Sequence, residues 1–452
     1  MTTHFYSDKG VNRMIGAFFA FMKDRSDCMN ESLQTVPDVI SFDSMTFEEQ
    51  KQHFLHVAKK ALPLWDYPQD STIKLLNITE NATYRIEHSG YEPIVMRVHR
   101  LNYAEKDSIM TEISWILDLR KDTSLHLATP LKSKKGSYIQ TIETPELNER
   151  RHVVCFSYEK GKAPVDSHDD TATIGKIASV ANKIPNRITL PVFRFAAVAY
   201  DKMNKIGTGN KKGTLSHDDI AMYRKLGEIA AIIHTHSKSW NPPDFYARIE
   251  WDWDATFGDG WNNFYGAHYR DLKILNEMDL ETIDACAYLM KKRIDAYGKS
   301  PDRYGMIHSD LRMANLLQNG SEITVLDFDD CGRGWYMYDI AGIVGFMEHR
   351  PDLPAILSEI LIGYRKKAYL SKQDELELPT FIMMRRIGLL QAMIYHVDNT
   401  SAGAGESAEL SPEILAFYAK GTVVLARQYI RNFKKLPLPR ANKTREEGTY
   451  HE

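Results

Sequence analysis

Short runs in which apolar and polar residues alternate fill much of the chain between residues 72 and 157. Alternation with a period of two is typical of half-buried strands. The predicted strands are Ile73–Leu76, Ala82–Glu87, Pro93–His99, Tyr138–Ile142 and His152–Phe156. Between the third and fourth strands, over about Lys106–Arg120, apolar residues such as Ile109, Ile113 and Ile116 recur at helical spacing. This pattern predicts a small lobe of five strands and one helix.

Helical periodicity dominates the rest of the chain. A helix is expected over about Phe47–Leu62, and Thr46 with Glu49 three residues later forms a capping-box signal at its start. Another strong helix begins at Ser216, with Asp219 as a weaker start signal. Further helices are expected at residues 281–297, 353–370, 375–396 and 411–434. The pattern therefore predicts an α+β protein with a small antiparallel β lobe and a mostly helical large lobe.

The same pattern divides the chain into segments. The expected segments are an N-terminal extension at 1–45, a small lobe at 46–157, a helical lobe at 158–436 with an insertion at 164–214, and a flexible tail at 437–452. The stretch Gly207–Thr214 in the insertion invites comparison with a phosphate-binding loop. It departs from the Walker pattern, because its lysines precede the last glycine and no strand leads into it. A solvated loop is the preferred interpretation.

Composition indicates an ordinary globular protein. The chain has 452 residues, 43% hydrophobic and 26% charged, and its net charge of -3 argues against a nucleic-acid partner. Cys28, Cys155, Cys286 and Cys331 form no C-x-x-C pair, which favours free thiols in a reducing compartment. The apolar run Met14–Met22 is too short to span a bilayer and has no cleavage site behind it. We therefore expect a cytoplasmic protein with no membrane partner.

The most informative stretch reads H-x-D-x-x-x-x-N, from His308 through Asp310 to Asn315, and D-F-D follows at Asp327–Asp329. Phosphoryl transfer from a nucleotide requires these groups. Asp310 would orient the attacking hydroxyl and take its proton, whereas Asn315 and Asp327 would hold Mg²⁺ on the phosphates. The first motif alone can arise by chance, as in a fortuitous acidic hairpin. The second motif at this spacing makes chance a much poorer explanation.

The residues between the two motifs predict how Asn315 and Asp327 meet. Asn319-Gly320 separates two short apolar runs, and Asn-Gly in that setting is a strong β-hairpin signal. A hairpin brings its two ends together. We therefore expect the loop, the hairpin and the acidic end of its second strand to form one metal clamp.

The run Ile307–Asp339 resembles the aminoglycoside phosphotransferase and choline kinase-like family, which has a two-lobed protein-kinase-like fold. It is similar to bacterial phosphotransferases akin to stress-response kinase A and the homoserine kinase-like enzymes. The resemblance covers about residues 70–160 and 220–430 and is most specific in the catalytic segment. It implies a kinase that uses ATP, or GTP, together with Mg²⁺.

The resemblance also assigns the remaining phosphate contacts. The family carries a cation on the third strand, and Arg97 takes that place here, where protein kinases have lysine. Arginine keeps the charge and can donate two hydrogen bonds to phosphate oxygens. Glu112, in the following helix, would form an ion pair with Arg97 and fix its rotamer. The alternatives are a surface strand arginine and a solvent-facing helix glutamate.

Two further segments complete the expected nucleotide site. The loop Asn77–Thr83 would cover the phosphates, and because it has no glycine, Thr79, Asn81 and backbone N–H groups would make the contacts. An ordinary hairpin turn is the alternative. The segment Phe156–Glu159, which includes Tyr158, resembles the hinge that binds adenine.

Several other polar residues are expected to serve the structure. His308 would hold backbone in place, and the resemblance implies that Asp339 supports the catalytic loop through hydrogen bonds. The H-T-H triplet at 234–236 has the wrong spacing for a helical metal pair and should combine a packing histidine with an exposed one. Asp329 and Asp330 would contact a second Mg²⁺ or a cationic substrate, or be solvated.

These observations predict a kinase that phosphorylates a hydroxyl of a small molecule, and they leave open whether that molecule also has an amine. The insertion and helix 375–396, with Arg385, Arg386 and His396, would line the acceptor site. One alternative is a Ser/Thr protein kinase, although the segment after Asp327 leaves no room for a long activation segment. The other is a catalytically silent nucleotide-binding scaffold, which the intact motif residues oppose. The oligomeric state stays open.

Overall fold

The structure, a computed structural model, describes residues 42–78, 81–101, 105–165, 215–258, 263–398 and 412–439. The expected extension at 1–45 lies outside the described residues except for 42–45, and the insertion at 164–214 except for 164–165. Thr79, the glycine-rich stretch and the tail from residue 440 also lie outside them. The domain limits therefore stay a prediction.

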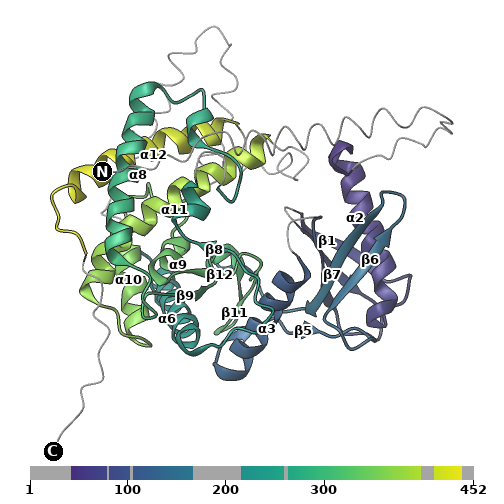
Figure 1. The fold of residues 1–452 in the computed structure, drawn as a ribbon. Coiled ribbons are helices and arrows are strands. Elements are labelled where there is room, and N and C mark those ends of the chain that lie inside the picture. Colours follow the sequence, from purple (N-terminus) through teal and green to yellow (C-terminus); the bar gives the residue numbers. More distant parts are fainter. Residues whose placement is uncertain are drawn as a thin grey trace, which may run out of the picture.

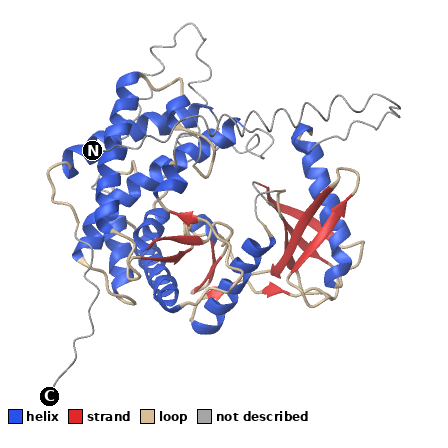
Figure 2. Cartoon of the chain, in the orientation of Figure 1, coloured by secondary structure: helices blue, strands red, loops and turns tan. Residues whose placement is uncertain are grey.

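The described chain forms two lobes, a β lobe and a mostly helical lobe (Figures 1 and 2). Within the described residues, the β lobe holds one antiparallel six-stranded sheet in the order β1-β2-β3-β7-β5, with β6 paired to β7. The strands are β1 (Thr72–Ile78), β2 (Ala82–Glu87), β3 (Ile94–Val98), β5 (Pro130–Leu131), β6 (Ile139–Thr144) and β7 (Glu149–Ser157). The five predicted strands are present. The sequence did not reveal β5, because two residues are too few to show alternation.

Helix α2 (Phe47–Ala61) covers one face of this sheet. On β2 and β3, the residues facing α2 include Tyr84, Met96 and Val98, all of them buried. Side chains alternate along a strand, so Arg97 lies on the opposite face, toward the second lobe. The predicted capping box at the start of α2 is confirmed, since Thr46 and Glu49 exchange both hydrogen bonds.

Helix α3 (Lys106–Asp122) runs between the two lobes (Figure 1). Its apolar side chains, including Ile113, Trp115 and Leu119, belong to the core of the helical lobe. One turn away, Glu112 faces the β lobe and is buried. A single helix therefore fixes the position of the β3 strand relative to the second lobe.

The helical lobe contains three-stranded sheets with the orders β10-β11-β4 and β8-β12-β9 among its described residues. Its strands are β4 (His126–Leu127), β8 (Glu250–Trp251), β9 (Tyr304–Ile307), β10 (Leu316–Asn319), β11 (Glu322–Val325) and β12 (Gly332–Trp335). Its helices are α6 (His217–Ser239), α7 (Trp253–Phe257), α8 (Glu277–Tyr297), α9 (Tyr336–Ile343), α10 (Leu353–Arg365), α11 (Lys372–Asp398) and α12 (Pro412–Phe433). Short 3-10 helices occupy Phe42–Ser44, Leu62–Trp65, Tyr269–Asp271 and Met313–Asn315.

The predicted helices of this lobe are confirmed, including the α6 start at the Ser216 and Asp219 capping box. Cys155, Cys286 and Cys331 are buried free thiols, whereas Cys28 lies outside the described residues. Within the described ranges, none of the helices combines the length and apolar character that a bilayer span needs. The triplet prediction is wrong in one respect, because His234 and His236 are both buried. His234 faces α9 and His236 faces α3, so two neighbouring elements cover this part of α6.

Helices α6 and α10 cross closely through two glycines. A Cβ built on Gly227 would collide with the carbonyl oxygen of Ile360, and one on Gly363 with that of Arg224. Both obstacles are backbone atoms, which cannot rotate away. Gly388 of α11 is a matched control, because its Cβ would meet Thr256 at an ordinary 3.5 Å.

We expect Gly227→Ala to lower the free energy of unfolding by about 1–3 kcal/mol, because the helices must separate. Gly388→Ala should be neutral or stabilising by up to about 1 kcal/mol through helix propensity. Thermal melts of the two variants beside the parent protein measure the difference. Equal melting temperatures for both variants would contradict this account of the crossing.

Candidate active site

The catalytic loop follows β9 and is held by a buried carboxylate. Asp339 of α9 accepts hydrogen bonds from the backbone N–H groups of His308 (3.2 Å) and Ser309 (2.7 Å). Burial alone would raise the pKa of Asp339, but the hydrogen bond from His234 (2.9 Å) and these backbone contacts lower it. Ser309 has φ 71°, a backbone conformation that few residues other than glycine adopt without support. The supporting contacts expected of Asp339 are present.

The His308 ring links the loop to the hairpin that follows. Its Nδ1 accepts a hydrogen bond from the N–H of Asp310 (3.3 Å), so its Nε2 carries the proton and donates to the carbonyl oxygen of Leu326 (2.9 Å). Both nitrogens are therefore occupied by backbone. This arrangement fits the expectation that His308 positions backbone.

Asp310 is surrounded by donors. Its Oδ1 accepts from Nε of Arg312 (2.9 Å) and from Nη2 of Arg385 (2.9 Å). Its Oδ2 accepts from Nη2 of Arg312 (3.0 Å) and Nδ2 of Asn315 (2.8 Å). Burial would raise the pKa of Asp310, but the two guanidinium groups outweigh it and lower the pKa to about 2. A carboxylate has about four lone-pair sites, so a further donor, such as the expected acceptor hydroxyl, could bind Asp310 only by displacing one of these donors.

The hairpin forms as predicted. Strands β10 and β11 pair with Leu316 opposite Val325, and the N–H of Leu326 donates to the carbonyl oxygen of Asn315 (2.9 Å). Asn315 and Asp327 therefore lie at the two adjoining ends of the hairpin. The Asn315 amide donates to the backbone and side chain of Asp310 (both 2.8 Å), which leaves its Oδ1 available as a ligand.

Asp327 lies in an electrostatically unfavourable place. It has φ 61°, and burial, followed by the charge of Asp329, raises its pKa to about 7 although Arg97 opposes the shift. Such a shift indicates an excess of negative charge that a divalent cation would neutralise. No set of three or more His, Cys, Asp or Glu side chains converges as a metal site in the described part of the chain. One carboxylate and one amide oxygen completed by phosphates and water nevertheless suit Mg²⁺, so these residues fit the ion.

The expected ion pair between β3 and α3 is present. Nη2 of Arg97 contacts both carboxylate oxygens of Glu112, at 2.8 and 2.7 Å. Arg97 is only 7% exposed, so the surface alternative is wrong. Its Nη1 lies 3.6 Å from Asp329, and Asn81 donates to the same carboxylate at 2.6 Å. Asn81 also accepts from the N–H of Arg100 (3.1 Å), so it joins the edge of the β lobe to the D-F-D motif.

Tyr158 lies beside the other expected nucleotide segment. The guanidinium of Arg85 on β2 lies 4.1 Å from the centre of its ring and donates to its hydroxyl at 3.1 Å. The structure thus brings together Asp310, Asn315, Asp327, Arg97, Glu112 and Asn81, and puts Tyr158 at the hinge end of β7. Thr79 is outside the described residues.

The sequence patterns missed two functional candidates. Arg312 lies two residues after Asp310, and its position in the catalytic loop was a usable signal. Arg385 was expected only in the acceptor wall, and nothing local ties it to Asp310, which is 75 residues away along the chain. Asp329 was left open, and it forms part of the Arg97 network.

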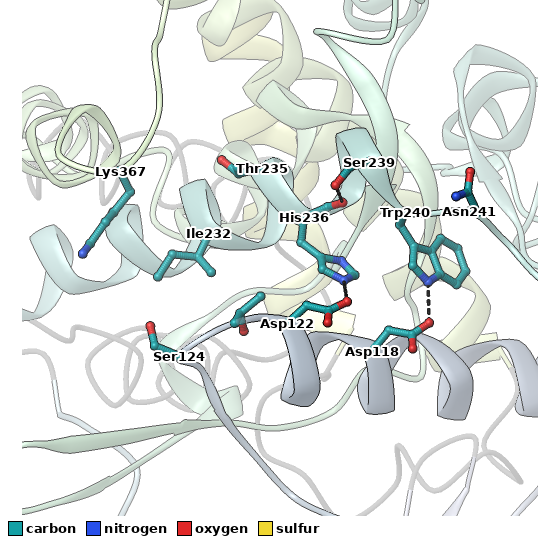
Figure 3. A pocket seen from close by; sticks show the side chains of 11 residues that line it. Asp118, Asp122, Ser124, Ile232, Thr235, His236, Ser239, Trp240, Asn241 and Lys367 are labelled. Carbon is teal, nitrogen blue, oxygen red and sulfur yellow. Dashed lines mark hydrogen bonds and ion pairs between the residues drawn. The ribbon is translucent and has the colours of Figure 1, made fainter.

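A groove of about 620 Å³ lies elsewhere, between the end of α3 and the end of α6 (Figure 3). None of the predicted site residues lines it. The groove is therefore separate from the predicted catalytic residues.

Comparisons with known proteins agree with this geometry. Residues 206–376 match the phosphotransferase enzyme family named APH. A solved microcompartment-associated aminopropanol kinase is 30% identical, with a TM-score of 0.64, and the match covers 84% of this chain and 98% of that one. The chain belongs to the phosphotransferase enzyme family. The expected resemblance, the two-lobed kinase-like fold and the enzyme class are thereby confirmed.

Two more distant relatives act on amicoumacin. The amicoumacin kinase of Bacillus subtilis (strain 168) is 23% identical over 218 residues, which are 45% of this chain and 60% of that protein. The chain thus matches less than two thirds of that relative's length. The structure of amicoumacin kinase hAmiN with AMP-PNP, Ca²⁺ and Ami is 18% identical, with a TM-score of 0.55 over 88% of this chain and 98% of that one. This likeness supports the fold.

The raised pKa of Asp327 has a consequence for stability. A carboxyl whose folded-state pKa is about 7, against an ordinary 3.8, stabilises the fold at low pH, and this contribution is lost as pH rises through about 7. Asp327→Asn removes the titration. In metal-free buffer, we expect the variant to match the parent near pH 4 and to exceed it at pH 8, by on the order of a few kcal/mol.

Thermal melts across this pH range, with EDTA, measure the effect. Asp295→Asn is the control, since Asp295 is an exposed partner of Lys291 and should follow the parent at every pH. If the difference in free energy of unfolding between the parent and Asp327→Asn stayed constant from pH 4 to pH 8, the raised pKa of Asp327 would be ruled out.

Proposed function

We propose that the protein is an ATP- and Mg²⁺-dependent kinase that transfers the γ-phosphoryl group to a hydroxyl of a small molecule, in the cytoplasm. The acceptor oxygen attacks the γ-phosphorus, the bond between this phosphorus and the β,γ-bridging oxygen breaks, and ADP leaves. Asp310 orients the acceptor hydroxyl and takes its proton. GTP is the alternative donor.

The single observation that carries this proposal is the joint geometry of the catalytic loop and hairpin. Asn315 contacts Asp310 directly and adjoins the end of the hairpin that bears Asp327. One hydroxyl-orienting carboxylate and two metal ligands thus lie together beside Arg97, a fixed cation for the phosphates. Catalysis by positioning and charge neutralisation needs little more.

We infer that Asp327 and Oδ1 of Asn315 would hold Mg²⁺, which would supply positive charge against the phosphates when bound. Arg97, fixed by Glu112, contacts phosphate oxygens. Thr79 and Asn81 lie in the loop that would cover the phosphates, and Tyr158 lies where the adenine would bind. Asn81 already contacts Asp329, so its part in this site is to hold the loop against the D-F-D motif.

We propose that the acceptor is an amino alcohol. The aminopropanol kinase is the more similar of the solved relatives, and its name specifies a hydroxyl close to an amine. A protein acceptor has less support, because β12 at Gly332–Trp335 leads straight into α9 at Tyr336, without the long segment that positions a peptide. A silent scaffold is opposed by the retention of Asp310, Asn315 and Asp327.

The proposal is tested by screening amino alcohols, then a metabolite extract, with γ-labelled ATP. We expect Mg²⁺-dependent phosphorylation of an amino alcohol, and Asp310→Asn should lower kcat by about a hundredfold or more while nucleotide affinity changes little. Asp295→Asn should retain full activity. Unchanged kcat in folded Asp310→Asn would contradict the role of Asp310, and Mg²⁺-dependent ATP binding without any transfer would favour the scaffold.

Arg385 is expected to position Asp310 from outside the catalytic loop. Arg385→Met removes one of the donors to Oδ1, so the Asp310 carboxylate should rotate and its pKa should rise toward the ordinary range. We expect kcat to fall about tenfold to a hundredfold with the nucleotide KM unchanged. The pH dependence of kcat should show an acid limb moved to higher pH, and Arg385→Lys should recover part of the loss. A pH profile identical to that of the parent would show that Arg385 only packs.

A further inference from the structure

The groove between α3 and α6 is lined by groups of both charges (Figure 3). Asp118 and Asp122 extend from the C-terminal part of α3, and Lys367, which follows α10, lies at one end of the groove. Its volume of about 620 Å³ lies within the usual range for small-molecule sites. The rest of the lining is largely hydroxyl, amide and indole groups.

The two carboxylates are placed where a cation would stabilise them. They lie four residues apart on one helix and at its C-terminal end, so they repel each other and the helix dipole. Asp118 is held in place because its Oδ2 accepts from Nε1 of Trp240 at 2.8 Å. Among the residues that the structure describes, Asp122 has long ion pairs, with Nε2 of His236 at 3.6 Å and Nζ of Lys121 at 3.7 Å.

His236 forms part of the groove wall beside Asp122. It is 9% exposed, and its Nε2 lies 3.6 Å from the Asp122 carboxylate. Asp118, Asp122 and His236 do not converge as a metal-ligand set in the part of the chain that the structure describes, so an organic cation fits better than a metal ion.

Lys367 would pair with a negatively charged group on the ligand. Among the described residues it has no ion-pair partner, whereas the adjacent Lys366 contacts Glu228 at 2.9 Å. An anionic group on the ligand would therefore pair with Lys367 without displacing any contact.

We propose that this groove is a second binding site, for a small dipolar molecule whose ammonium group lies against Asp118 and Asp122 and whose anionic group lies against Lys367. A phosphorylated amino alcohol, the product of the proposed reaction, has this pair of groups. That choice of ligand class rests on the proposed function, whereas the site itself does not.

Two successive aromatic contacts link the groove to the D-F-D motif. Trp240 contacts Trp115 of α3 (ring centres 6.3 Å apart), and Trp115 contacts Phe328 edge-on (5.7 Å). Phe328 is the central residue of D-F-D. A ligand that orders the end of α3 therefore acts on the helix that carries Glu112 and that packs, through Trp115, against Phe328 beside Asp327. The groove is thus suited to control of the enzyme by its product.

Isothermal titration of the full chain with O-phosphoethanolamine tests the proposal. We expect binding that weakens about tenfold or more in Asp118→Asn/Asp122→Asn and in Lys367→Met, a loss of about 1.4 kcal/mol or more. Asparagine at 118 still accepts from Trp240, so only the charge is removed. Asp107→Asn at the other end of α3 and Lys366→Met are matched controls that should bind like the parent. Ethanolamine and inorganic phosphate, each with one of the two groups, should bind more weakly.

Further variants separate this site from the catalytic one. Binding retained in Arg97→Met but lost in the groove variants supports the proposal. Binding lost in Arg97→Met and retained in the groove variants, or absent at millimolar probe, overturns it. If no amino alcohol is phosphorylated and the groove still binds the probe, the proposed acceptor fails and the second site stands. If an amino alcohol is phosphorylated and the groove binds no probe, the second site fails and the proposed acceptor stands.

Discussion

Carboxylates buried close together must each be matched by a cation or a proton, and this constraint organises the whole site. Asp329 and the glutamate of α3 share Arg97, and two other arginines hold Asp310. Asp327 accepts no hydrogen bond from an arginine among the described side chains, and its pKa rises to about 7. A proton matches Asp327 below about pH 7, and above that pH a cation from outside the chain would match it. The proposed metal site is therefore supported by charge balance as much as by the motif.

Helix α3 connects the charged groups of the β lobe to the D-F-D motif of the helical lobe. Glu112 on one side fixes the cation of β3, while Trp115 on the other side packs against Phe328 between the two motif aspartates. Its apolar residues belong to the core of the helical lobe. Helix α3 thus fixes the distance from Arg97 to the residues proposed to bind the metal. A displacement of the end of α3 would therefore affect both sides of the site.

Local signals in the sequence predicted most of the fold and the centre of the site. Asn319-Gly320 determines its hairpin within four residues, so the meeting of Asn315 and Asp327 followed from the sequence alone. Strand alternation did not place Arg97 correctly: it gave weak support to a surface position, whereas Arg97 is buried between the lobes. Residues such as Arg385 could not be assigned to Asp310, because their contacts depend on how helices cross, and that is decided by packing across the whole lobe. The burial of His236 was missed for the same reason, since α3 covers it.

The saturation of Asp310 implies that the reactive geometry forms only when ligands bind. All its lone-pair positions are used, so the acceptor hydroxyl must replace a donor. Asn315 is fixed by its backbone contacts, and Arg385 is almost fully buried. Arg312 is 33% exposed and reaches Asp310 from the same loop, so it can leave most easily. The γ-phosphate of a bound nucleotide would attract this guanidinium, and the departure of Arg312 would free Asp310 for the acceptor only after the donor nucleotide is in place.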